Sequence, residues 1–114
     1  MPTRSLGPQV FQILLSLADA DLHGYAIIAD VRRRTQDQMR LTASTLYAAL
    51  KRLLDQRWIE ELAPPPDESD SRRRYYRLTA EGRRAGKAEA GRLEALAAMA
   101  RDRKWLPRPR RSRG

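Results

Sequence analysis

The sequence predicts a mainly α-helical protein that carries one β-hairpin and ends in a long helix. Three observations support this fold class. Apolar residues recur at helical spacing in three stretches before residue 58. Two short aromatic and β-branched segments then flank a proline-rich loop, and a long helix-forming stretch follows them. The length of 114 residues is that of one domain.

The composition limits the chemistry that the chain can perform. It contains no cysteine and a single histidine, His23, so we expect neither a metal ion nor any other cofactor. The serines lack a nearby base and there is no glycine-rich phosphate loop, which argues against an enzyme. No apolar run reaches membrane-spanning length, so we expect a soluble cytoplasmic protein with no membrane partner.

The formal net charge of +9 suggests a polyanionic partner, but this charge is unevenly distributed. Residues 103–114 hold six basic residues and no acid, so the rest of the chain carries only +3. We interpret residues 107–114 as a disordered basic tail and residues 1–7 as a disordered lead. Between them we expect a folded domain over residues 8–78 and a dimerisation helix over residues 79–106.

The first two helices are predicted over about residues 8–18 and 25–35, with turn-forming residues at 19–24 between them. The first is apolar almost all round, so one face needs a second chain or a long later helix to cover it. The second ends in the arginines of residues 32–34, which suit either a helix C-terminus or phosphate contacts. His23 is expected to be a structural residue near the helix start.

A third helix is predicted over residues 41–57, and its leucines fall on one stripe: Leu46, Leu50, Leu53 and Leu54. Thr42 or Ser44 can cap its start, because a hydroxyl accepts from the free amides of the first turn. The outward face carries hydroxyls first and basic residues further on, which suits the DNA major groove as well as a solvated surface. The candidate DNA contacts on this helix are Thr42, Ser44, Thr45, Lys51 and Arg52.

The two segments at residues 58–62 and 74–78 predict a β-hairpin. The alternation in the second segment places Tyr76 and Leu78 on one face, opposite Tyr75 and Arg77. The loop between the strands, APPPDESDSRR, predicts a long mobile tip. Three arginines stand where this loop returns to the second strand: Arg72, Arg73 and Arg74. If the hairpin is a wing, these arginines suit a DNA minor groove or the flanking phosphates. Otherwise they belong to a solvated loop.

The last helix is predicted over about residues 80–104, capped by Thr79 and ended by Pro107 and Pro109. About 25 residues span roughly 37 Å, which is longer than a domain of this size can cover. The surplus apolar length predicts a homodimer. The candidate interface residues are Phe11, Leu14 and Leu15 in the first helix and Leu93, Leu96, Ala97 and Ala100 in the last.

Three stretches in this order resemble the PadR family of bacterial transcriptional regulators: LHGYAI at 22–27, STLYAALKRL at 44–53 and RRRYYRLTAEGR at 72–83. The resemblance covers roughly residues 8–104, and the single C-terminal helix resembles the smaller of its subfamilies. It implies a winged helix-turn-helix fold in a homodimer that binds a palindromic operator, usually as a repressor. It also implies that the first and last helices form the dimer interface.

The resemblance assigns roles to particular residues. The helix that holds Ser44, Thr45, Tyr47 and Lys51 would enter the major groove, with Tyr47 hydrogen-bonding backbone near the wing. The tip at residues 72–74 would contact the flanking minor groove.

Some family members respond to phenolic acids or bind flat aromatic drugs between their subunits, which implies a small aromatic or phenolic effector. Drug-binding members place an aromatic residue in the middle of the last helix. Here Leu93 and Leu96 occupy that position, and Trp105 lies near the end.

The sequence thus predicts a sequence-specific DNA-binding regulator, and two other functions stay open. One is a winged-helix protein-interaction module, but an apolar outward face would suit it better than hydroxyls and basic residues do. The other is a non-specific nucleic-acid binder driven by the arginine-rich tail.

Overall fold

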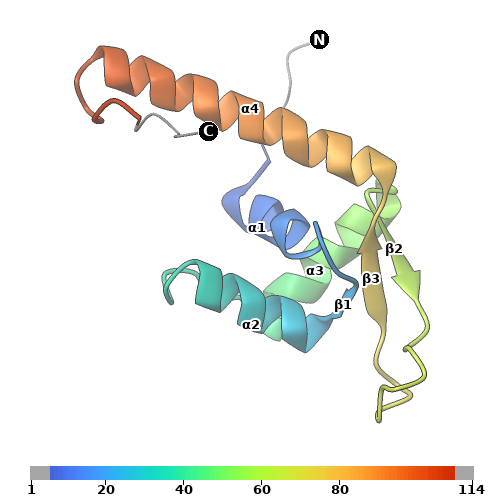
Figure 1. Cartoon of the computed structure of the whole chain (residues 1–114). Coiled ribbons are helices and arrows are strands. Elements are labelled where there is room, and N and C mark those ends of the chain that lie inside the picture. The colour runs from blue at the N-terminus through green and yellow to red at the C-terminus, as the bar shows by residue number, and fades with distance from the viewer. Residues whose placement is uncertain (1–5, 110–114) are drawn as a thin grey trace.

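The computed structural model describes residues 6–109, and these form a helical core with a small sheet at one side and a long helix across the top (Figure 1). The elements in chain order are α1 (Pro8–Ser16), β1 (Leu22–His23), α2 (Gly24–Arg34), α3 (Ala43–Asp55), β2 (Ile59–Leu62), β3 (Tyr75–Leu78) and α4 (Ala80–Asp102). The predicted fold class, mainly α with a β-hairpin, is confirmed.

The core lies where α1, α2 and α3 meet. Its largest fully buried apolar side chains are Ile13, Ile27, Val31, Leu46 and Leu50. Burying one such side chain stabilises the fold by about 1.5–3 kcal/mol. The predicted leucine stripe of α3 is confirmed for Leu46, Leu50 and Leu53, whereas Leu54 packs at the edge and is only partly buried. The stripe therefore determines which face of α3 points outward.

The hairpin is confirmed, and a third strand joins it. Strands β2 and β3 pair antiparallel, with Glu61 opposite Tyr76. Residues 19–24 were expected to form only a turn, but Leu22 and His23 pair with Tyr76 and Tyr75 of β3, so the sheet order is β1-β3-β2. This pairing covers the free edge of β3 with a strand too short to show a sequence pattern.

Two positions after the last residue of α2, α3 and α4 stands a non-glycine residue with a left-handed backbone: Gln36, Arg57 and Lys104 have φ values of 49°, 61° and 65°. At the end of α4, the amide of Trp105 donates to the carbonyl of Ala100 at 2.9 Å, and that of Lys104 to Arg101 at 2.8 Å. This pair of bonds is a Schellman motif, which terminates a helix. Helix α4 therefore ends at Asp102, before the prolines predicted to stop it.

The start of α4 packs directly on the chain that follows α3. The hydroxyl of Thr79 accepts from the amide of Gly82 at 3.0 Å, which confirms the predicted cap, and donates to the carbonyl of Arg57 at 2.7 Å. A Cβ on Gly82 would lie 2.0 Å from the carbonyl oxygen of Trp58. Only glycine therefore permits this approach of the two backbones.

The N-terminal lead is shorter than predicted. Leu6 packs against the core, and its amide donates to Oε1 of Glu89 in α4 at 3.2 Å. The Glu89 side chain is only 2% exposed, and its hydrogen bond from Arg92 lowers its pKa. The predicted disorder is therefore wrong for Leu6, while residues 1–5, like residues 110–114 of the predicted tail, lie outside the described range.

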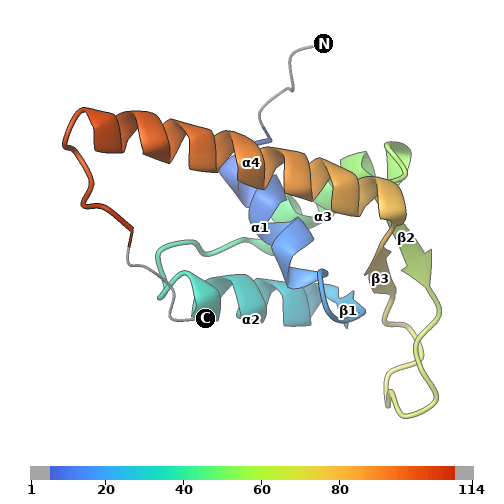
Figure 2. The same cartoon turned by 45° about the horizontal axis from the view of Figure 1, so that its top comes forward.

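Helix α4 crosses over α1, and its C-terminal half extends beyond the rest of the molecule in both views (Figures 1 and 2). Residues of this half leave large apolar side chains exposed, among them Leu93, Leu96 and Met99. No helix among residues 6–109 is both long and apolar enough to cross a membrane.

Candidate nucleic-acid interface

The outward face of α3 carries the candidate DNA contacts that the sequence predicted. Thr42, rather than Ser44, caps the helix, and its hydroxyl accepts from the amide of Thr45 at 3.1 Å. Ser44 is therefore free to face solvent, together with Tyr47 and Lys51. Residues 44, 47 and 51 lie three and four apart, which places them on one side of the helix. Arg52 is also exposed, while Thr45 is half-buried and its hydroxyl accepts from the hydroxyl of Thr42 at 2.9 Å.

The wing places Arg72, Arg73 and Arg74 beside this helix, but each is paired with an acid of the same hairpin. Arg72 lies 3.3 Å from Asp70, Arg73 lies 3.3 Å from Glu68, and Arg74 lies 3.2 Å from Glu61. The wing is therefore less positive than its three arginines alone would suggest. Arg72 is the most open, with 89% of its side chain exposed.

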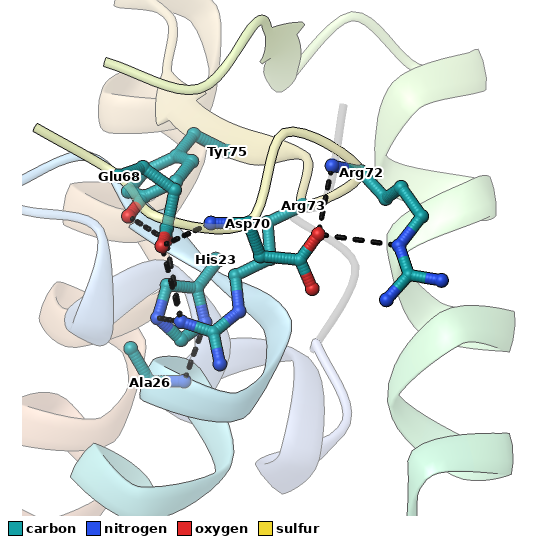
Figure 3. Close-up of polar contacts among 7 residues, drawn as sticks. All are labelled: His23, Ala26, Glu68, Asp70, Arg72, Arg73 and Tyr75. Carbon is teal, nitrogen blue, oxygen red and sulfur yellow. Dashed lines mark hydrogen bonds and ion pairs between the residues drawn. The ribbon is translucent and has the colours of Figure 1, made fainter. Parts of the chain in front are cut away.

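Glu68 organises the returning half of the wing loop (Figure 3). Its side chain is 6% exposed and accepts from the hydroxyl of Tyr75 at 2.6 Å and from the amide of Asp70 at 3.2 Å. These bonds and the one from Arg73 lower the pKa of Glu68 to about 2, with the Tyr75 hydroxyl as the largest cause. The loop predicted as a mobile tip thus has a defined set of hydrogen bonds. The acidic residues between its prolines and its arginines accept these bonds.

His23 connects the wing to the start of α2. Its Nδ1 accepts from the amide of Ala26 at 3.2 Å and so caps the helix, which confirms the predicted structural role. Its Nε2 lies 3.5 Å from a guanidinium nitrogen of Arg73. The imidazole also packs edge-on against Tyr75, with 5.3 Å between ring centroids. Sequence analysis found the helix start but missed this contact between segments far apart in the chain.

The arginines at the end of α2 have mainly structural contacts. Arg34 turns toward α1, where it donates to the carbonyl of Gln12 at 2.9 Å and to the hydroxyl of Ser16 at 2.7 Å. Arg33 pairs with Asp30, and Arg32 pairs with Asp37 just beyond the helix. Of the two interpretations of residues 32–34, the contacts of Arg34 favour the structural one.

The predicted dimer-interface residues separate into three groups by their exposure. Leu14 is 3% exposed and belongs to the core of its own chain, so its side chain is not available to a partner. Leu15, Leu93 and Leu96 are exposed, whereas Phe11, Ala97 and Ala100 are half-buried. An apolar cavity of about 160 Å³ lies between α1 and α4. Met99, which was not among these candidates, follows Leu96 by three residues and is also exposed.

A helical core that holds α3 with a hydroxyl-rich and basic face outward, followed by a two-stranded wing, defines a winged helix-turn-helix protein of the kind that binds DNA. The family model of the transcriptional regulator PadR-like family matches residues 13–88. The chain belongs to this family, whose members are transcriptional regulators and not enzymes.

Solved structures of similar proteins agree with this assignment. A transcriptional regulator from Clostridium thermocellum is 28% identical with a TM-score of 0.72, and the match covers 82% of this chain and 87% of that one. A PadR family transcription regulator from hypervirulent Clostridium difficile is 26% identical with a TM-score of 0.72, covering 84% of this chain and 97% of that one. Uncharacterized protein X of Lysinibacillus sphaericus is 36% identical over 72 residues, which span 62% of this chain and 64% of that protein.

Proposed function

We propose that this protein is a cytoplasmic, homodimeric repressor that binds a palindromic operator. The outward face of α3 carries this proposal, because Ser44, Tyr47 and Lys51 are exposed there while the leucines on the other side are buried. Hydroxyl and ammonium groups can bond base edges and phosphates of the major groove. The leucine stripe fixes the rotation of the helix, so these side chains meet a duplex in one orientation.

Two features support a homodimer. The exposed leucines of α4 lie on the half that extends beyond the body of the chain, and exposed Leu15 borders the apolar cavity between α1 and α4. A second copy that packs its α4 against this surface would cover both. A two-fold dimer then presents two copies of α3, which is the arrangement that reads a palindrome.

The cavity between α1 and α4 also supports a small aromatic or phenolic effector. Its walls are mainly apolar, and Arg83 and Lys87 stand at its border as partners for a carboxylate. BpsR of Bordetella bronchiseptica, whose DNA binding is regulated by 6-hydroxynicotinic acid, shares the fold at 19% identity and a TM-score of 0.60, over 87% of this chain and 67% of that one. An aromatic acid is the ligand class that the walls and border of this cavity suit.

A salt titration on two duplexes tests the proposed function against its alternatives. One duplex is obtained by selection from random sequence, and the other is a scrambled version of it. We expect the selected duplex to bind at least about a thousandfold more tightly at physiological salt. A protein-interaction module would enrich no duplex in the selection, and a non-specific binder would bind the recovered and scrambled duplexes equally.

Deletion of residues 107–114 is the companion experiment, because it removes the basic segment that could bind any duplex. Each lost phosphate contact should flatten the plot of log affinity against log salt by about 0.9. We expect the deletion to weaken both duplexes alike and leave their ratio unchanged. A ratio that collapses on deletion would make the tail, and not α3, the source of specificity.

A further inference from the structure

A second cavity, of about 270 Å³, lies between the start of α2, the outward face of α3 and the wing. Its walls are His23, Gly24, Tyr25, Tyr47, Asp70, Arg72, Arg73, Arg74 and Tyr76. We propose that this cavity is a binding site for one phosphate group, with Tyr25 and Arg72 as its main ligands, and that in the cell the phosphate belongs to bound DNA. The inference rests on the proposed function for the source of the phosphate, but not for the chemistry of the site.

Arg72 provides the charge for this site. Its Nε bonds Asp70 at 3.3 Å, and its two terminal nitrogens make no hydrogen bond or ion pair among residues 6–109. Figure 3 shows the Arg72 side chain extending away from the Arg73–His23 contact, on the opposite side of the loop. A guanidinium whose terminal nitrogens are open can donate two parallel bonds to a phosphate.

Tyr25, which also lines the cavity, provides a neutral donor. Its side chain is 68% exposed, although it lies next to the buried Gly24 at the start of α2. A phenol this exposed contributes little to folding, and its hydroxyl can donate to a phosphate oxygen. The first turn of α2 adds a favourable electrostatic field, since the positive end of the helix dipole faces the same cavity.

Tyr47 relates this site to the recognition face of α3. A Cβ on Gly24 would lie 2.8 Å from the hydroxyl oxygen of Tyr47, so this phenol lies against the start of α2. Tyr47 therefore belongs both to the outward face of α3 and to the wall of the cavity. A duplex that receives α3 in its groove brings its own phosphates to the mouth of this cavity, which favours DNA over a free anion.

Asp70 is the one carboxylate in the wall, and it opposes an anion. It holds Arg72 through both the Arg72 amide, at 2.9 Å, and Nε. The wall also holds three arginines, but Arg73 and Arg74 pair with Glu68 and Glu61 next to the cavity, so the open terminal nitrogens of Arg72 are what attract an anion here. Asp70 orients Arg72 at some cost in affinity for the phosphate, so Asp70→Asn should tighten DNA binding severalfold.

The first test uses inorganic phosphate alone, so it does not depend on whether the protein recognises a DNA sequence. Amide spectra of the full chain are recorded with increasing phosphate and, as a reference, with chloride at equal ionic strength. We expect phosphate to shift the amides of Gly24, Tyr25 and Arg72, and these shifts to vanish in Tyr25→Phe/Arg72→Gln. Equal shifts in both salts would overturn the site.

The second test asks whether the phosphate belongs to DNA, with the selected duplex as the probe. Tyr25→Phe should weaken binding roughly tenfold without changing the salt slope, because it removes a hydrogen bond to a charged group but no charge. Arg72→Gln should weaken binding similarly and flatten the slope by about 0.9. Arg84→Gln, which removes one exposed charge from α4, is the matched control and should leave the affinity for the selected duplex nearly unchanged.

Neutral methylphosphonates, placed one at a time along the selected duplex, identify the phosphate itself. One position should weaken binding of the parent protein but not of Tyr25→Phe/Arg72→Gln. If no position behaves in this way and both single variants bind like the parent, the site does not hold a DNA phosphate. If no duplex is selected at all while inorganic phosphate still shifts the amides, the proposed function fails and the phosphate site stands.

Discussion

His23 and Arg73 lie 50 residues apart in the chain, yet Nε2 of the imidazole is 3.5 Å from Nη1 of the guanidinium. The same histidine caps α2, and the same arginine bonds Glu68 of the wing loop at 3.3 Å. The wing is therefore positioned against the helix-turn-helix by side chains and not only by the strands that carry it. Contacts at this junction should determine where the wing arginines lie when a duplex is bound.

Glu68→Gln should make the stability of the protein less dependent on acid pH. The pKa of Glu68 falls from 4.5 to about 2 on folding, so its ionised form stabilises the native state. This contribution is complete above pH 4.5 and is lost as the pH falls toward 2. Glutamine keeps an acceptor for Tyr75 but carries no charge. The variant should be less stable than the parent at pH 7, and the gap should close below pH 4.5.

Urea unfolding at several pH values measures this gap. Asp67→Asn is the matched control, because it removes an exposed acid from the same loop, and it should change the free energy of unfolding by less than about 0.5 kcal/mol at pH 7. A gap between parent and Glu68→Gln that stays constant from pH 7 to pH 3 would show that the charge of Glu68 does not stabilise the wing.

Replacing Ser44 or Lys51 with alanine should cost about 1–3 kcal/mol of binding free energy for the selected duplex. Neither side chain belongs to the core, so the melting temperature should barely change. Fluorescence anisotropy and thermal unfolding of the same samples separate the two effects. If both variants bind as tightly as the parent, α3 is not the helix that enters the major groove.

Leu96→Glu should dissociate the dimer while leaving the fold of each chain intact. The side chain is 48% exposed in the single chain, so the substitution costs little until a partner covers it and desolvates the carboxylate. Sedimentation should give a monomer for Leu96→Glu and a dimer for the volume-matched Leu96→Met. A parent protein that sediments as a monomer, or a Leu96→Glu variant that remains a dimer, contradicts the proposed interface.

Gly82→Ala and Gly91→Ala should have opposite effects on stability, although both lie in α4. An alanine Cβ at residue 82 would lie 2.0 Å from the backbone oxygen of Trp58, so the helix must shift, at a cost of about 1–3 kcal/mol. At residue 91 it meets nothing within 4 Å and should stabilise the helix by about 0.5–1 kcal/mol. Denaturant unfolding measures the free energy of unfolding of both variants. Equal changes in this free energy would disprove the close approach at Gly82.

The helices and the hairpin could be predicted from the sequence because their signals are local. The leucine stripe of α3, the Thr79 cap and the alternation of residues 75–78 each depend on neighbours within a few residues. Strand β1 could not be predicted in this way, because two residues carry no period and its partner lies more than 50 residues away. The helix ends were also missed, since Arg57 and Lys104 stand where glycine is the usual signal.

The residues of the candidate site also divide into those with a local sequence signal and those that depend on contacts between distant segments. Ser44 and Lys51 could be assigned to the outward face because the stripe fixes the opposite one. The cavity at the wing could not be predicted, because it depends on how α2, α3 and the loop pack together. Tyr25 and Asp70 gave no sequence signal for a phosphate site. The pairing of each wing arginine with an acid could not be predicted either, because it is the folded hairpin that brings Glu61 opposite the arginine segment.

Selection of bound sequences from random duplex DNA tests the central claim most directly, because it reports both specificity and symmetry. The proposed homodimer predicts an enriched palindrome whose half-site centres lie about 10 base pairs, or a multiple of this, apart. The enrichment should be lost with Ser44→Ala/Lys51→Ala and retained with the control Arg84→Gln. Failure to enrich any motif, or an enriched motif without two-fold symmetry, would contradict the account of a dimeric operator-binding repressor.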